Sequence, residues 1–196
     1  MGKRFLALFG MLIALTTAAE AQEKGFVVGE VGLTFAERTD ALFGVEAGFT
    51  VTNNLQIVGL FEHMQDTLTG DLATSLRLFG QLGDVRIEGK IPTNYIAGGV
   101  RYNVGTGMGV RPYFQFEAGV GQIDPALTFI NSRGEDVTDE TDYELSETNA
   151  AIALCAGVRG DIGSRMTIEV AYKWLNILTD ETLKINRFHF GIGAHF

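Results

Sequence analysis

The chain has little cysteine and little proline. Its 196 residues include one cysteine, Cys155, and three prolines, so no disulfide can form within the chain. Cys155 has Ala151, Ala153 and Gly157 at alternate neighbouring positions, which favours a small packed side chain over a reactive thiol. The stability of the fold must come from another source, and closure of a sheet on itself would provide it.

Clusters of basic residues are also lacking. The chain has 15 Lys and Arg residues against 24 Asp and Glu residues, for a formal net charge of −9. Binding to the phosphates of nucleic acid needs grouped Lys and Arg side chains. We therefore predict no nucleic-acid partner.

The apolar run at the N-terminus is too short to span a membrane as a helix. It follows Lys3 and Arg4 and covers residues 5–15, whereas a spanning helix needs about 20 residues. A basic start, a brief apolar segment and small residues at Ala19 and Ala21 are typical of a secretory signal peptide. We predict a cleaved signal peptide over residues 1–21 and one mature domain over residues 22–196.

Apolar residues alternate with small or polar residues in eight segments, which indicates strands. The segments are 25–35, 42–51, 55–64, 93–104, 113–122, 149–160, 166–175 and 185–196. Each has about ten residues, the length of a strand that is tilted across a membrane.

The two faces of these strands differ in size. Phe114, Phe116 and Val120, for example, alternate with Gln115 and Glu117. Large side chains would overfill the narrow interior of an eight-stranded barrel, whereas small and polar ones fit. We therefore predict an all-β fold, an eight-stranded antiparallel up-and-down transmembrane β-barrel with its large apolar residues facing lipid.

The connections between segments alternate in length. Those at 52–54, 105–111 and 161–165 are short, whereas 65–92 and 123–148 exceed twenty residues. In outer-membrane barrels the short turns face the periplasm and the long loops face outward. The first long connection carries apolar residues that predict either an amphipathic piece on the rim or a strand extension, namely Leu72, Leu76, Leu78 and Phe79.

Both faces of the third segment are apolar. Leu55, Ile57 and Phe61 alternate there with Val58, Leu60 and Met64. This pattern predicts a bulge or a change of register in the third strand.

The C-terminal stretch, Arg187 to Phe196, ends in phenylalanine and has apolar or aromatic residues at alternate preceding positions. It resembles the closing strand of bacterial outer-membrane barrels. With the signal peptide and the stretch Arg111-Pro112-Tyr113-Phe114, the chain is similar to the small OmpA/OmpX-type or opacity-type barrel family.

This resemblance implies a monomer in the outer membrane of a Gram-negative bacterium, surrounded by lipid and lipopolysaccharide. It also implies that the barrel-assembly machinery recognises the closing strand through Phe188, Phe190, Ile192 and Phe196.

Charged residues fall on the face that is predicted to line the interior. They are Glu30, Glu46, Glu62, Glu117 and Glu169, with Arg101, Arg159, Lys173 and Arg187. Buried charges must be paired or solvated. We predict an internal network of ion pairs, with Arg101 and Glu117 on adjacent strands as one example. A narrow polar pore is the alternative.

The sequence offers no catalytic, cofactor-binding or metal residues that we would name. Lipid A deacylases of this barrel type resemble one another in a His and a Ser two residues apart, but Gly191 stands two residues after His189. His189 and His195 share a face at about 20 Å along the strand, too far apart to bind one ion.

The second long connection is rich in acidic residues between Asp124 and Glu147. Such a run is usually solvated. The alternative is a divalent cation that links the loop to lipopolysaccharide, although the spacing fits no EF-hand.

These patterns predict a structural, envelope-integrity or adhesion-type role, with an unknown ligand outside the cell. A channel for small solutes is the main alternative. A lipid-modifying enzyme and a soluble lipocalin-like carrier are the others.

Overall fold

The computed structural model describes residues 25–35, 39–67, 85–105, 109–131, 133–136, 146–163, 165–179 and 182–196. The strands in this part of the chain are β1 (Gly25–Phe35), β2 (Thr39–Thr50), β3 (Leu55–Met64), β4 (Val85–Lys90), β5 (Thr93–Asn103), β6 (Val110–Ile123), β7 (Ala126–Asn131), β8 (Glu147–Ile162), β9 (Met166–Ile177) and β10 (Leu183–His195). No helix within these ranges has the length and apolar composition to cross a membrane. The predicted signal peptide and the apolar residues 72–79 lie outside the described residues.

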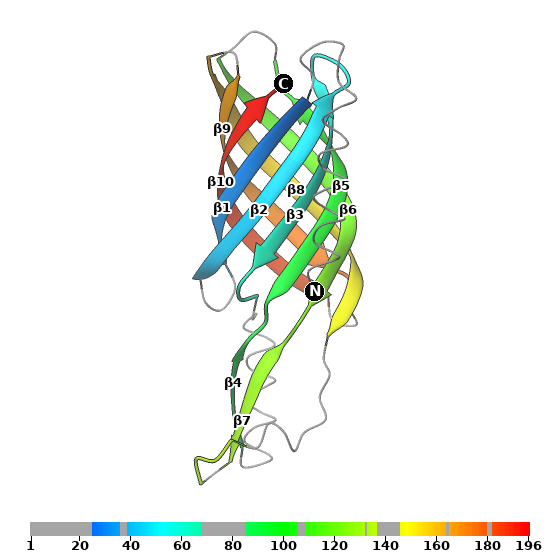
Figure 1. The fold of residues 1–196 in the computed structure, drawn as a ribbon. Coiled ribbons are helices and arrows are strands. Elements are labelled where there is room, and N and C mark those ends of the chain that lie inside the picture. Colours follow the sequence, from blue (N-terminus) through cyan, green and yellow to red (C-terminus); the bar gives the residue numbers. More distant parts are fainter. Residues whose placement is uncertain are drawn as a thin grey trace.

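Eight strands close into one barrel, in the order β1-β10-β9-β8-β6-β5-β3-β2 (Figure 1). All the pairings are antiparallel, and β1 closes the barrel against β10. The predicted eight-stranded barrel is confirmed. The ends of its strands differ from the predicted segments by at most three residues.

The barrel has a turn end and a loop end. At the turn end the described chain begins and finishes, and Gly25 N–H donates to the Phe196 carbonyl at 2.9 Å. The short connections between β2 and β3, β5 and β6, and β8 and β9 lie at the same end. The loop end carries β4 and β7, which extend beyond the barrel (Figure 1).

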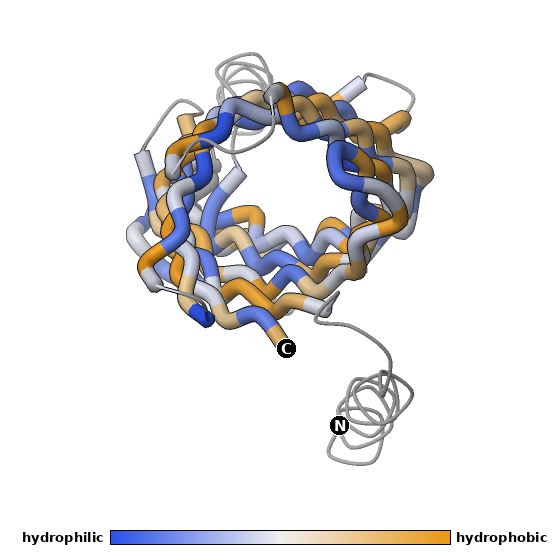
Figure 2. Tube along the Cα trace, turned by 90° about the horizontal axis from the view of Figure 1, so that it is seen from above, coloured by the Kyte–Doolittle hydropathy of each residue, from blue (hydrophilic) through white to orange (hydrophobic). Residues whose placement is uncertain are grey.

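The outer wall of the barrel is apolar. Figure 2 views the barrel end-on and shows hydrophobic and hydrophilic residues alternating along the strands. Phe114 is 60% exposed and Leu154 is 57% exposed, with Trp174 and Val170 also exposed. Water would disfavour so large an apolar surface, whereas lipid would not.

β3 has no bulge, and that prediction is wrong. Its pairing with β2 runs without interruption from Met64 opposite Leu42 to Gln56 opposite Thr50, and its pairing with β5 is equally regular. Val58, Leu60 and Met64 are buried because they point into the barrel. Apolar and polar residues do not alternate in the sequence of β3, because its inward-facing side chains at these three positions are apolar as well.

An apolar cluster fills the loop end of the interior. It consists of Leu42, Leu60, Met64, Tyr95, Ala97, Ala151, Ala153, Leu175, Ile177, Leu183 and Ile185. The prediction of an interior made of small, polar and charged residues is therefore incomplete. Residue size alone misses this cluster, since a barrel that is filled rather than hollow also accepts large side chains at one end.

β4 and β7 form a two-stranded antiparallel ribbon (Figure 1). Lys90 pairs with Ala126 and Thr93 pairs with Ile123, so the ribbon keeps the register of β5 and β6. β4 with β5 and β6 with β7 therefore form one long hairpin, which is part of the barrel wall and continues beyond the loop end. The ribbon corrects the prediction of long loops at 65–92 and 123–148, because part of each connection is a strand.

Polar residues fix the base of this ribbon to the barrel rim. Ile91 N–H donates to Asp66 Oδ1 at 3.1 Å, and Thr67 N–H donates to the Ile91 carbonyl at 3.0 Å. The hydroxyl groups of Thr67 and Thr93 lie 2.7 Å apart in a hydrogen bond. Asp66, Thr67 and Thr93 are all buried, so the ribbon leaves the rim from a fixed position.

Candidate functional site

The interior of the barrel is the candidate site, because every charged residue predicted for it is buried. Each is at most 3% exposed, and each of the eight barrel strands contributes at least one. They are Glu30, Glu46, Glu62, Arg101, Glu117, Arg159, Glu169, Lys173 and Arg187. Alternation places them inside, since successive side chains of a strand point to opposite faces.

The part of the network nearer the turn end centres on Arg101. Its guanidinium lies 2.6 Å from a Glu46 oxygen and 3.3 Å from Glu169 Oε2. Arg159 approaches the same Glu169 oxygen at 3.5 Å. Arg101 also stacks over the Tyr113 ring at 4.2 Å from its centroid, so it has both charged and aromatic partners.

The second part centres on Glu62 and Lys173. Lys173 Nζ lies 2.8 Å from Glu62 and 2.7 Å from Glu117. Arg187 forms an ion pair with the other oxygen of Glu62. Three cation–carboxylate contacts thus join β3, β6, β9 and β10 across the interior.

Gln115 connects the two parts. Its amide donates to Glu46 at 2.8 Å and to Glu117 at 2.7 Å, and its carbonyl accepts from Arg101 Nε at 2.6 Å. This bonding joins the two groups into one belt of charges around the inside of the barrel, which we call the charged belt.

The predicted pair of Arg101 with Glu117 is wrong. The register sets Arg101 opposite Gln115, and Glu117 opposite Gly99. Arg101 therefore pairs across the interior with Glu46 and Glu169, and Glu117 pairs with Lys173. Which side chains meet across the interior depends on the register of every strand pair around the barrel, and these registers cannot be read from a single sequence.

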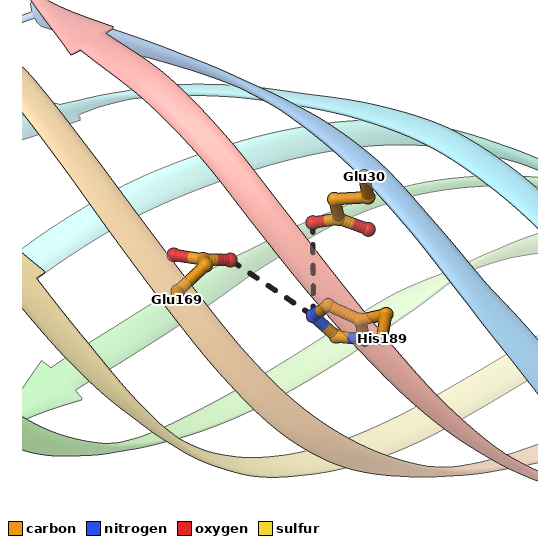
Figure 3. A group of neighbouring side chains, drawn as sticks. All are labelled: Glu30, Glu169 and His189. Atoms are coloured by element: carbon orange, nitrogen blue, oxygen red, sulfur yellow. Dashed lines mark ion pairs between the residues drawn. The ribbon is translucent and has the colours of Figure 1, made fainter.

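His189 lies between two carboxylates in the same interior (Figure 3). Its Nε2 is 3.9 Å from Glu30 Oε1 and 3.9 Å from Glu169 Oε1. His189 is 1% exposed. From the sequence we considered only whether His189 and His195, on one strand, could bind an ion. We missed this group because the three residues come from β1, β9 and β10.

The remaining predicted residues are placed as follows. Phe188, Phe190, Ile192 and Phe196 lie on the outward face of the C-terminal strand and its end, each more than a third exposed. Cys155 is buried beside Tyr113 and is not in a disulfide. Its setting matches a packed side chain.

The chain is similar to known proteins through a family model and through solved structures. The family model described as "Outer membrane protein beta-barrel domain" matches residues 5–196. No curated protein sequence matches the chain. Solved structures that resemble it are small outer-membrane barrels with low sequence identity.

Neisserial surface protein A has a TM-score of 0.54 and 10% identity, with 87% of this chain and 94% of that chain covered. The attachment invasion locus protein Ail of Yersinia pestis has a TM-score of 0.53 and 16% sequence identity, with 89% of this chain and 100% of that chain covered. The N-terminal barrel domain of Pseudomonas aeruginosa OprF has a TM-score of 0.54 and 16% sequence identity, with 89% of this chain and 100% of that chain covered. At these identities the likeness shows the fold alone.

Proposed function

Because this chain belongs to the outer membrane protein beta-barrel domain family, we propose that it is a closed outer-membrane barrel that presents the β4–β7 ribbon outside the cell for contact with a partner. The observation that carries the proposal is the continuous register of the ribbon with β5 and β6. A projection built as part of the wall is held rigidly, as a binding surface should be.

The ribbon offers two features that suit contact with another molecule. In the part of the chain that the structure describes, β4 pairs only with β7, so β4 has an edge that a further strand could join, whereas the outer edge of β7 bridges to Asp136 at Ile130. Leu127 and Phe129 share one face of β7 and remain half-buried. A two-stranded ribbon is marginal alone, and its anchorage to the rim compensates for this.

The filled interior favours this role over that of a channel. The charged belt crosses the barrel, and the apolar cluster occupies its loop end. An ion would have to break the paired charges and enter an apolar layer, both at a high cost in free energy. We therefore expect the barrel to be silent in planar lipid bilayers, and regular conductance steps would favour the channel instead.

Export and assembly complete the proposal. Residues 1–21 act as a signal peptide that is removed on export to the outer membrane of a Gram-negative cell. The barrel-assembly machinery reads the closing strand, and lipid with lipopolysaccharide surrounds the outer wall. The short turns then face the periplasm, and the ribbon faces outward.

Attachment of cells that express the chain tests the proposed role. We expect expression to increase attachment to epithelial cell layers, and deletion of 85–90 together with 126–131 to remove that gain. A matched control replaces Thr52 and Asn53 at the turn end with serine and should attach like the wild type. Equal attachment by the ribbon deletion and the wild type, at equal amounts of folded barrel, would refute the role.

A further inference from the structure

Two interior carboxylates face each other across a glycine at the seam where the barrel closes. Gly191 of β10 pairs with Glu30 of β1 on one side and with Glu169 of β9 on the other. A Cβ at position 191 would lie 2.7 Å from Val28 Cγ1 and 2.8 Å from Glu169 Cγ, so the glycine lets the side chain of Glu169 lie close against the backbone of β10. His189 stands two residues earlier on the same inward face.

The three side chains approach one another without forming hydrogen bonds. Both distances from His189 Nε2 to the carboxylate oxygens are 3.9 Å, beyond the range of a hydrogen bond. Glu30 Oε2 and His189 Nδ1 have no hydrogen-bond partner, although both residues are at least 97% buried. Buried polar atoms in proteins are normally satisfied, so protein hydrogen bonds do not saturate Glu30 and His189, although these two atoms are not the ones that face each other.

The charges of the belt also leave Glu30 uncompensated. Glu46, Glu62, Glu117 and Glu169 each have a lysine or arginine within 4.0 Å. Among the described residues, Glu30 is the interior glutamate whose ion-pair contact is with a histidine alone. A buried carboxylate needs a cation or a proton.

We infer that Glu30, Glu169 and His189 bind one divalent transition-metal ion, with Zn²⁺ the best match. This site goes beyond the surface role proposed above. Imidazole nitrogen and carboxylate oxygen are ligands that Zn²⁺ accepts, and the three ligand atoms lie within 4.8 Å of one another. Tetrahedral bonds of about 2.1 Å place ligand atoms about 3.4 Å apart, so each 3.9 Å gap closes by about half an ångström.

Neighbouring groups orient the ligands. Arg101 and Arg159 hold Glu169 Oε2, which turns Oε1 toward His189. Tyr113 also donates to Oε1, at 3.5 Å. Such outer contacts fix the geometry of ligands. The two arginines lower the affinity for a cation, and the unpaired charge of Glu30 offsets this.

Metal retention by the refolded barrel tests the site. The site is closed to solvent, so the mature chain is refolded in detergent micelles with Zn²⁺ and then passed through a metal-free column. We expect one Zn²⁺ per chain for the wild type. Glu30→Gln and His189→Gln should retain less than about one tenth of an equivalent, because each removes a ligand.

His195→Gln is the matched control, since His195 lies on the same strand at the turn end. It should retain one Zn²⁺, and a band shift on boiling confirms that each variant has folded. Refolding with Co²⁺ adds a second readout, the visible absorption of a tetrahedral site. The site is refuted if the folded wild type retains no metal, which leaves a proton on His189 as the balancing charge. Retention by folded His189→Gln, or equal loss in His195→Gln, refutes it as well.

Discussion

At the scale of single residues, each member of the charged belt depends on partners from other strands. Glu62 accepts ion pairs from Lys173 and Arg187. Lys173 also contacts Glu117, but the described ion pairs of Arg187 involve Glu62 alone. Loss of the Glu62 charge therefore affects Arg187 more than Lys173.

We predict that Glu62→Gln destabilises the barrel by about 3–5 kcal/mol, because it leaves the Arg187 guanidinium buried without a countercharge. Urea unfolding in micelles measures the free energy of unfolding. Asp40→Asn is the control, since the Asp40–Lys90 pair is 3.2 Å apart and its lysine is 58% exposed. It should cost less than about 1 kcal/mol, and equal losses in the two variants would contradict the prediction.

The outward residues depend on lipid rather than on protein. Leu154 lies in the middle of β8 and Val110 begins β6, and both are 57% exposed. We predict that Leu154→Arg costs about 2–4 kcal/mol in lipid bilayers, and Val110→Arg about 0–1 kcal/mol, because the cost of a charge falls toward the interface. Unfolding in liposomes compares them, and equal costs would argue against a spanning wall.

At the scale of elements, the ribbon depends on its base. Asp66 accepts the Ile91 N–H next to Pro92, where the hairpin crosses the rim. We predict that Asp66→Ala leaves that buried N–H unpaired and loosens the ribbon, so limited proteolysis cuts within 85–91 several times faster. The barrel should still shift on boiling, and unchanged cleavage would show that the base is held by other contacts.

The C-terminal end of the chain, after β10, completes the pairing that closes the barrel against β1. Phe196 exchanges two backbone hydrogen bonds of 2.9 Å with Gly25 and is 42% exposed on the outer wall. We predict that Phe196→Ala lowers the amount of folded barrel in the outer membrane, since the proposed assembly signal loses its terminal aromatic group. Refolding of the purified variant in detergent is the control and should proceed as in the wild type.

The eight barrel strands follow from the sequence because alternation and strand length are local properties. β4 and β7 do not, since each has only six residues and is defined by its partner. The buried position of Glu30 and His189 also follows from alternation. Their approach to Glu169 does not, because it depends on the registers of β1, β10 and β9.

At the scale of the whole molecule, every backbone ladder of the barrel is continued around the ring, so no barrel strand is left with a free edge. Such a closed sheet resists detergent. We predict that the barrel runs as a compact band in SDS without heating and shifts after boiling. A single unshifted band from a soluble periplasmic fraction would favour a lipocalin-like carrier.

We expect the closure of β1 on β10 to be the last pairing to form during folding. The other barrel pairings join barrel strands that are consecutive in the chain, with only β4 or β7 between two of the pairs, whereas this one joins the first and the last barrel strand. Local hairpins form early, and contacts of high sequence separation form late. Glu30 and His189 sit on opposite sides of this last seam, so a kinetic probe placed on that pair would time the final step of folding.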